Sequence, residues 1–283
     1  MRALLIRVAG LALTLALALA LPLNVAHAGR SCEQSRLDPT TFAKAMTLAE
    51  NTRAALEASG AQVALLARAG QDLSSYGLHY SHLAFAWRDH PKGRWLVMHE
   101  LNQCGTAQSA LFDQGLGNFF LDDMFEYKSV ILVPGAQGQA RLAAALGSKL
   151  AARMHEARYN MLAYPFSVRH QNSNQWVLEA YAASQSESTI ESENKSESLS
   201  AIESRGKAQA WLKFAGYKPG RVWVPTAKRL GARLFRANVD FDDHPLAMRM
   251  TGQIDTVTVE SVLQFVRRHD REAALIVVGL ENR

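Results

Sequence analysis

The chain has 283 residues, of which 48% are hydrophobic and 20% are charged. This length and composition allow a sizeable buried core, so disorder of the whole chain is excluded. The formal net charge of +5 comes from scattered Lys and Arg residues without a long basic block, which argues against nucleic-acid binding.

The first 28 residues have the pattern of a secretory signal peptide. Arg2 and Arg7 precede an Ala/Leu-rich run at residues 8–21, and Ala26-His27-Ala28 supplies the small residues of a signal-peptidase site. We expect cleavage after Ala28 and a mature protein, 29–283, that is periplasmic or secreted. The alternative is an uncleaved anchor, but the run barely reaches the roughly 20 residues of a spanning helix. No later segment is apolar enough to span a membrane.

Export would change the expected chemical state of the two cysteines. Cys32 and Cys104 would mature in an oxidising compartment, where a disulfide between them is the simple expectation. The alternative role for Cys104, a reactive thiol, is disfavoured in that compartment.

The mature chain begins with a predicted helix, a strand and a hairpin. Asp38-Pro39 supplies an N-cap and a first-turn proline, and apolar residues recur at near-helical spacing to about Ser59. The apolar run 62–68 predicts a strand, followed by a polar loop at 70–77. Two aromatic and aliphatic arms, 80–87 and 95–101, flank the Pro- and Gly-containing connector 88–94 and predict a β-hairpin.

Histidines on the hairpin are the first candidates for chemistry. Period-two alternation places His82 on one face with Tyr80, Ala84 and Ala86, where another group could approach it. The residue of the second arm that accompanies His82 depends on the strand register. One register brings His99 beside it, and a slip by one residue brings Glu100 instead. His99 is the favoured partner.

The rest of the chain alternates between helical, extended and polar segments. We expect an ordered loop at 102–123, a strand at 127–133 and a helix at 137–154. A buried helix should begin at Asn172 or Ser173. The Ser- and Glu-rich segment 184–205 cannot bury enough apolar surface to fold alone and predicts a flexible surface insertion. Further predictions are helices at 207–214, 226–236 and 259–267 and a strand at 221–224.

Hydrolysis through a hydroxyl nucleophile needs a nucleophile, a histidine base and a polar group that orients the base. Ser173 is the candidate nucleophile because a helix N-terminus offers free backbone N–H groups and a favourable dipole. His82 is the candidate base, and His99 or Glu100 the orienting residue. The competing interpretation is that Ser173 is only a helix cap and that the histidines are structural.

The sequence also raises two other kinds of site, a metal site and an anion-binding surface. His79 and His82 should point to opposite faces of one strand, and no Cys or carboxylate cluster accompanies His99 and His244, so we expect neither metal nor cofactor. Arginines of the 226–236 helix form a stripe that could touch anionic lipid or cell-wall polymer, although such a stripe is commonly a solvated helix face.

Several stretches together resemble a known bacterial family. They are Ser31-Cys32-Glu33, residues 71–95 with Tyr80-Ser81-His82, residues 115–123, residues 171–176 with Gln171-Asn172-Ser173, and residues 229–238. Together they resemble exported bacterial proteins grouped as domain of unknown function 2145, over nearly the whole mature chain except the insertion. This resemblance implies no established activity.

A more remote resemblance suggests a fold. The order of a histidine strand, a second strand and a helix that begins after an asparagine is similar to circularly permuted papain-like hydrolases of the NlpC-type and lecithin:retinol-acyltransferase-like group. There His82 matches the base, His99 the orienting residue and Ser173 the position of the nucleophilic cysteine. The departure from cysteine to serine puts activity in doubt, because a hydroxyl is much harder to ionise than a thiol.

These observations predict a single α+β, papain-like domain with a central antiparallel sheet and circularly permuted order. The first functional hypothesis is an amide or ester hydrolase or acyltransferase that acts on cell-envelope material. The alternative is a non-catalytic envelope protein that binds a small molecule, peptide, glycan or lipid.

Overall fold

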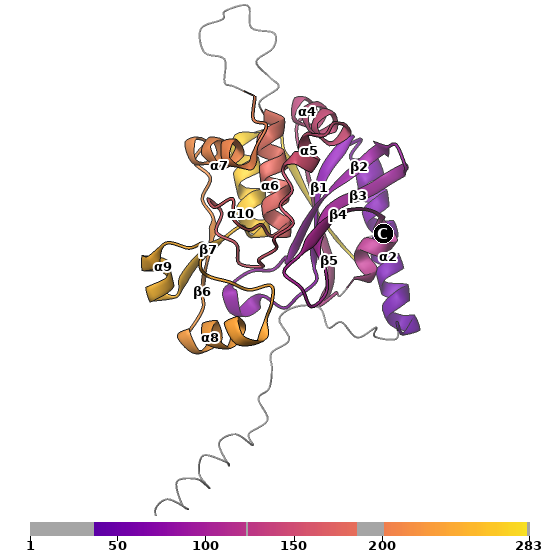
Figure 1. The fold of residues 1–283 in the computed structure, drawn as a ribbon. Coiled ribbons are helices and arrows are strands. Elements are labelled where there is room, and N and C mark those ends of the chain that lie inside the picture. The colour runs from indigo at the N-terminus through magenta and orange to yellow at the C-terminus, as the bar shows by residue number, and fades with distance from the viewer. Residues whose placement is uncertain (1–36, 123, 186–200, 282–283) are drawn as a thin grey trace, which may run out of the picture. The chain divides into compact units, whose positions relative to one another are not determined.

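Six antiparallel strands form the central sheet, in the order β4-β3-β2-β1-β5-β8 (Figure 1). The computed structural model describes residues 37–122, 124–185 and 201–281. The predicted signal peptide, Cys32 and most of the predicted insertion lie outside these residues, so the cleavage site and the Cys32–Cys104 disulfide stay predictions. The strands are β1 (Val63–Ala69), β2 (His82–His90), β3 (Gly93–Asn102), β4 (Ser109–Gly115), β5 (Glu126–Val133) and β8 (Ala274–Gly279).

Helices α2 (Pro39–Ala58) and α3 (Leu116–Leu121) cover one face of the sheet. Helix α2 begins as predicted, because the Asp38 carboxylate accepts the backbone N–H groups of Thr40 and Thr41 at 2.9 and 3.0 Å. Its buried side chains and Phe119 of α3 pack on the strand residues Ala84 and Val97. We call this side of the sheet the α2 face.

The opposite face carries the larger core. Helices α4 (Ala136–Gly147), α5 (Leu150–Arg153), α6 (Ser173–Ser184) and α10 (Val259–His269) pack on it, and α7 (Arg205–Phe214) adds to the same core. Trp176 of α6 is fully buried with its ring 5.6 Å from that of Phe85. Its indole N–H also donates to the carbonyl of Ala151 at 3.0 Å, which joins α6 to α5. We call this side the α6 face.

A smaller unit, here named the β6–β7 lobe, comprises residues 220–256. It contains the two-stranded sheet of β6 (Gly220–Trp223) and β7 (Gln253–Thr256), with helices α8 (Thr226–Phe235) and α9 (Leu246–Thr251) (Figure 1). Val222, Val224, Phe241 and Ile254 form its small core, against which Tyr76, the last residue of the short 3₁₀ turn Ser74–Tyr76, also packs.

Three sequence expectations were wrong. The predicted loop at 102–123 contains β4 and α3, and the hairpin strands extend through the predicted connector, leaving only Pro91 and Lys92 between them. The predicted helix 137–154 is interrupted at Ser148, which has an extended backbone and whose hydroxyl accepts the N–H of Leu150 to begin α5.

The edges of the predicted surface insertion also belong to the core. Ser184 ends α6 and is fully buried, and Ile202 and Arg205 are 4% and 7% exposed. The mixed α+β class and the antiparallel sheet are confirmed, whereas the papain-like fold and the circular permutation stay predictions. None of the helices in the described ranges has the length and apolar character needed to cross a membrane.

Candidate functional site

His82 and His99 form a hydrogen-bonded pair on the α2 face. His82 Nε2 lies 2.8 Å from His99 Nδ1, and His99 Nε2 lies 3.1 Å from Gln114 Oε1. The observed register pairs Phe85 with Met98. It differs by two residues from the register that favoured His99, and a shift of two preserves the faces. The expectation that His99, and not Glu100, accompanies His82 is therefore confirmed.

The hydrogen bonds of this pair fix where the protons lie. With Gln114 Oε1 as acceptor, His99 carries its proton on Nε2 and accepts the Nε2–H of His82 on Nδ1. Burial and the nearby charge of Arg68 hold the pKa of His82 well below its ordinary value and lower the pKa of His99 to about 4. Both imidazoles are therefore neutral at pH 7.

The guanidinium of Arg68 has hydrogen-bond partners in helix α3 and just after it. Its guanidinium donates to the carbonyl of Phe119 and, at 2.6 Å, to the carboxylate of Asp122, and it lies 4.7 Å from the centre of the Phe119 ring. The cluster therefore joins β1, β2 and β3 to α3.

Ser173 lies on the α6 face of the sheet, whereas the side chains of His82 and His99 pack against Phe119 on the α2 face. It is the first residue of α6, and the cap is Asn172, whose side chain accepts the N–H of Gln175 at 2.8 Å. The hydroxyl of Tyr159 is close enough to the Ser173 side chain for each to influence the other, and burial raises the pKa of Tyr159 to about 12. The structure thus brings His82 and His99 together and does not bring Ser173 to them.

Glu100 points from β3 to the α6 face and is fully buried. Neither of its carboxyl oxygens has a well-formed hydrogen bond, although the Ser109 hydroxyl is close enough to influence it. Burial raises the pKa of Glu100 to about 8, and the negative charge of Glu179 adds to the effect. The side chain is therefore mostly protonated at neutral pH.

Glu179 is the centre of a buried network that sequence reasoning missed. The side chain of Arg205 donates to it at 2.7 Å, and the amides of Gln171, Gln175 and Gln209 donate at 2.6, 3.0 and 2.7 Å. These contacts tie α6 to α7 and to the segment before α6. A partial signal was available, because Gln175 and Glu179 are four residues apart on one face of α6, and Gln171 precedes Gln175 by another four residues.

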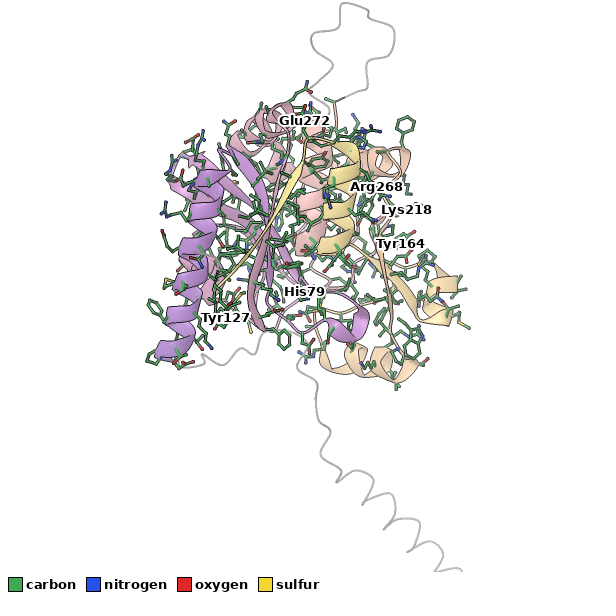
Figure 2. All side chains as sticks on the ribbon, turned by 180° about the vertical axis from the view of Figure 1, so that it is seen from behind. His79, Tyr127, Tyr164, Lys218, Arg268 and Glu272 are labelled. Atoms are coloured by element: carbon green, nitrogen blue, oxygen red, sulfur yellow. The ribbon has the colours of Figure 1, made fainter. Side chains whose placement is uncertain are left out.

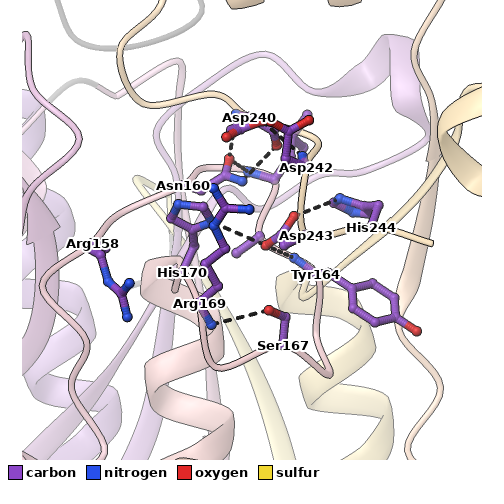
Figure 3. A network of polar contacts seen from close by, with 12 residues as sticks. Arg158, Asn160, Tyr164, Ser167, Arg169, His170, Asp240, Asp242, Asp243 and His244 are labelled. Atoms are coloured by element: carbon purple, nitrogen blue, oxygen red, sulfur yellow. Dashed lines mark hydrogen bonds and ion pairs between the residues drawn. The ribbon is translucent and has the colours of Figure 1, made fainter. Parts of the chain in front are cut away.

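A second network joins the segment before α6 to the loop before α9 (Figure 3). The buried carboxylate of Asp243 lies 3.0 Å from His244 Nδ1 and 3.5 Å from His170 Nδ1, and it accepts the N–H of Tyr164 at 3.1 Å. Asn160 contributes a further bond to the carbonyl of Asp240 at 2.7 Å. Within the described ranges, no group of three His, Cys, Asp or Glu side chains could hold a metal ion.

A comparison with protein families matches residues 55–266 to the family described as "Uncharacterized protein conserved in bacteria (DUF2145)". The chain belongs to this DUF2145 family. No curated protein and no solved structure matches it significantly. The part that matches DUF2145 includes His82, His99, Glu100, Ser173 and the Glu179 network.

A pocket of about 450 Å³ lies at the N-terminus of α4, partly beyond the DUF2145 match. Asp270 closes the helix end by accepting the N–H of Gly135 at 2.8 Å, and Glu272, labelled in Figure 2, packs against the same glycine. Sequence reasoning did not identify this pocket, because its residues come from three separate segments. They are Gly135, Gln137, Gly138, Arg141, Tyr181, Gln185, His269, Asp270, Arg271 and Glu272.

Proposed function

We propose that this protein is a non-catalytic binding protein of the bacterial cell envelope, built on a hydrolase-like α+β scaffold. The pattern of a signal peptide supports export, and the serine at the position where similar permuted hydrolases have cysteine supports the loss of catalysis. The ligand we propose is a small zwitterionic component of the envelope, such as the free end of a cell-wall peptide.

The observation that carries this proposal is the separation of Ser173 from the histidine pair. A serine attacks a carbonyl only when a neighbouring base takes its proton. The neighbour of Ser173 is Tyr159, whose pKa of about 12 keeps its hydroxyl protonated at neutral pH. His82 and His99 bond to each other on the α2 face. Neither half of the arrangement supports nucleophilic catalysis by itself.

The pocket beside α4 offers a place for the ligand. Its volume falls within the roughly 300–1,000 Å³ of small-molecule sites. Arg141 gives one hydrogen bond to Gln185 at 2.9 Å and leaves its buried Nε without a partner. Tyr181 is 2% exposed, and burial raises its pKa, so its hydroxyl remains a donor.

Donors and acceptors in this pocket match a zwitterion. Arg141 and Tyr181 would receive a carboxylate, because a guanidinium and a hydroxyl both donate to it. Glu272 would receive an ammonium group, while Asp270 is already bonded to the end of α4. The free amino and carboxyl groups of a short peptide satisfy both requirements.

The catalytic question is tested by turnover. We expect the mature protein, Ser173→Ala, Ser173→Cys and His82→Ala to leave peptidoglycan fragments and chromogenic esters unchanged, at the rate of the buffer alone. Turnover by the wild type that disappears in folded Ser173→Ala and His82→Ala would contradict the proposal and restore the hydrolase hypothesis.

The binding question is tested by calorimetry with short cell-wall stem peptides, either free or blocked by N-acetylation and C-amidation. We expect the free peptide to bind and the blocked peptide to bind at least roughly tenfold more weakly. Arg141→Gln and Tyr181→Phe should weaken binding, whereas Arg153→Gln, an exposed arginine outside the pocket, should not. Equal binding of the free and blocked peptides would exclude the zwitterion as ligand.

A further inference from the structure

Four large apolar side chains face solvent on the β6–β7 lobe. The exposed fractions are 63% for Trp223, 62% for Leu230, 69% for Leu246 and 75% for Met250. Single exposed apolar residues are common on protein surfaces, but large apolar side chains gathered on one small unit mark a surface that contacts something apolar.

Contacts within the lobe bring these residues' segments together. Arg229 of α8 donates to the carbonyl of Arg249 at the end of α9, and the carbonyl of Gly252 accepts the N–H of Val224 at 2.8 Å. A β-carbon added to Gly252 would lie 3.6 Å from the indole nitrogen of Trp223 and 3.6 Å from the guanidinium carbon of Arg229. Trp223, the first turns of α8 and the end of α9 therefore adjoin one another.

The lobe does not need these side chains for its own core. Alternation along β6 buries Val222 at 5% exposure and turns Trp223 outward. Leu246 and Met250 are four residues apart and therefore share one face of α9. Their exposure is thus set by the strand and helix geometry, and the packing of Val222 and Ile254 proceeds without them.

The charge around this apolar surface is positive. The lobe, residues 220–256, contains six Lys and Arg residues and four Asp residues, a net charge of +2 from 6 minus 4, and Lys218 lies directly before it. Within the lobe Asp255 pairs with Arg221 at 2.6 Å and Asp242 pairs with Arg249 at 3.2 Å, and the Asp243 carboxylate is fully buried between histidines. Lys218 and Lys228 are exposed. A surface that combines outward Trp, Leu and Met with cations is complementary to an anionic lipid bilayer.

We propose that the β6–β7 lobe docks on the surface of anionic phospholipid membranes, with Trp223, Leu246 and Met250 entering the headgroup region and Lys228 contacting lipid phosphates. This role is independent of the ligand pocket beside α4. It places the protein at a membrane surface as a peripheral component. A tryptophan suits that depth, because its ring is apolar and its N–H can remain in contact with water.

Trp223 supplies a direct readout. Trp87, Trp95 and Trp176 are buried, with exposed fractions of 9%, 2% and 0%, and Trp211 contacts Phe265 and His269 in the core. A blue shift of tryptophan emission on mixing with vesicles would therefore report chiefly on Trp223. The experiment uses the mature chain that begins after Ala28, because the apolar 8–21 run could bind lipid by itself.

Vesicles of phosphatidylglycerol mixed with phosphatidylcholine are compared with vesicles of phosphatidylcholine alone, by co-sedimentation and by emission. We expect binding and a blue shift with the anionic vesicles only, weakened when salt is raised to about 0.5 M. Trp223→Ser should weaken binding roughly tenfold through lost apolar burial. Lys228→Glu should weaken it about fivefold or more.

Two matched variants control for general loss of surface residues. Phe214→Ser removes an apolar side chain that is 88% exposed on α7, and Lys149→Glu reverses an exposed charge outside the lobe. Both should bind like the wild type, and circular dichroism should show that all variants are folded. Absence of binding to anionic vesicles, unchanged binding by Trp223→Ser, or an equal loss in Phe214→Ser would each overturn the proposal.

Discussion

His82 Nε2 and His99 Nδ1 lie 2.8 Å apart, each on a different strand of the same hairpin. The two rings meet because they share the α2 face and lie diagonally across β2 and β3. Burial and the charge of Arg68 keep both rings neutral, and with Gln114 as the final acceptor the chain of hydrogen bonds defines their tautomers. The pair therefore makes folding sensitive to acid.

The first prediction concerns His99 and acid. Its pKa of about 4 in the folded protein lies below the ordinary value of 6.5, so the unfolded chain binds the proton first as pH falls. Stability from this residue is present above pH 6.5 and is lost between pH 6.5 and 4, by about 3 kcal/mol. His99→Gln should reduce the acid-dependent loss of unfolding free energy in urea titrations by a similar amount.

The control for this experiment is Gln103→Ala, an exposed replacement that adds and removes no titratable group. It should leave the slope of unfolding free energy against pH unchanged. A wild-type slope retained in His99→Gln would show that His99 is not the group responsible.

The second prediction concerns Glu100 and has the opposite sign. Its pKa of about 8 in the folded protein lies above the ordinary 4.5, so the folded state retains a proton that the unfolded chain has lost. Stability should fall as pH rises from 4.5 to 8, by up to about 5 kcal/mol. Glu100→Gln keeps the shape without the charge and should gain stability relative to wild type at pH 8–9 but not at pH 4.5. Gln103→Ala, an exposed replacement without a titratable group, should show no such crossover.

The third prediction concerns the ion pair of Arg205 and Glu179. Arg205→Met leaves a fully buried carboxylate with three amide donors and no cation, and should lower the free energy of unfolding by about 3–5 kcal/mol. Lys207→Met on the same helix, at an exposed position, should change it little. Adding Glu179→Gln to Arg205→Met should recover part of the loss. A double variant no more stable than Arg205→Met would argue against an uncompensated charge as the cause.

The fourth prediction compares the loss of stability when each of two glycines at helix ends is replaced by alanine. Gly252 and Gly216 have nearly the same positive φ, 76° and 75°, but a β-carbon on Gly252 would lie 2.7 Å from the carbonyl oxygen of Val224, whereas Gly216 has open space. Gly216→Ala should cost about 1–2 kcal/mol for the left-handed backbone. Gly252→Ala should cost clearly more in thermal unfolding, and equal costs would contradict the close approach.

Capping residues and the alternation of side chains were the sequence signals that gave correct predictions. Asp38-Pro39 identified the start of α2, and alternation reduced the partner of His82 to His99 or Glu100, between which only the strand register decides. Strand β4 was missed, since its residues are mostly half-buried at the sheet edge and lack a clear alternating pattern. Strand β8, with Leu275 and Val277 exposed, was missed as well.

The separation of Ser173 from His82 could not be read from the sequence. Both faces of β2 are apolar and buried, with Leu83 and Phe85 on one side and Ala84 and Ala86 on the other. Alternation therefore says which residues share a face but not which face receives α6. That choice is made by side-chain volume, because the Trp176 ring packs against Phe85.

The position of strand β8 near the end of the chain determines when the sheet can be completed during synthesis. It begins at Ala274 and pairs along β5, which ends at Val133, and Asn51 of α2 binds the carbonyl of Gly279 at 2.9 Å. During synthesis one edge of β5 therefore lacks its partner strand until the intervening segment and β8 have emerged from the ribosome. An unpaired strand edge invites pairing with other chains, so release of a nascent chain before residue 274 would yield an aggregation-prone product.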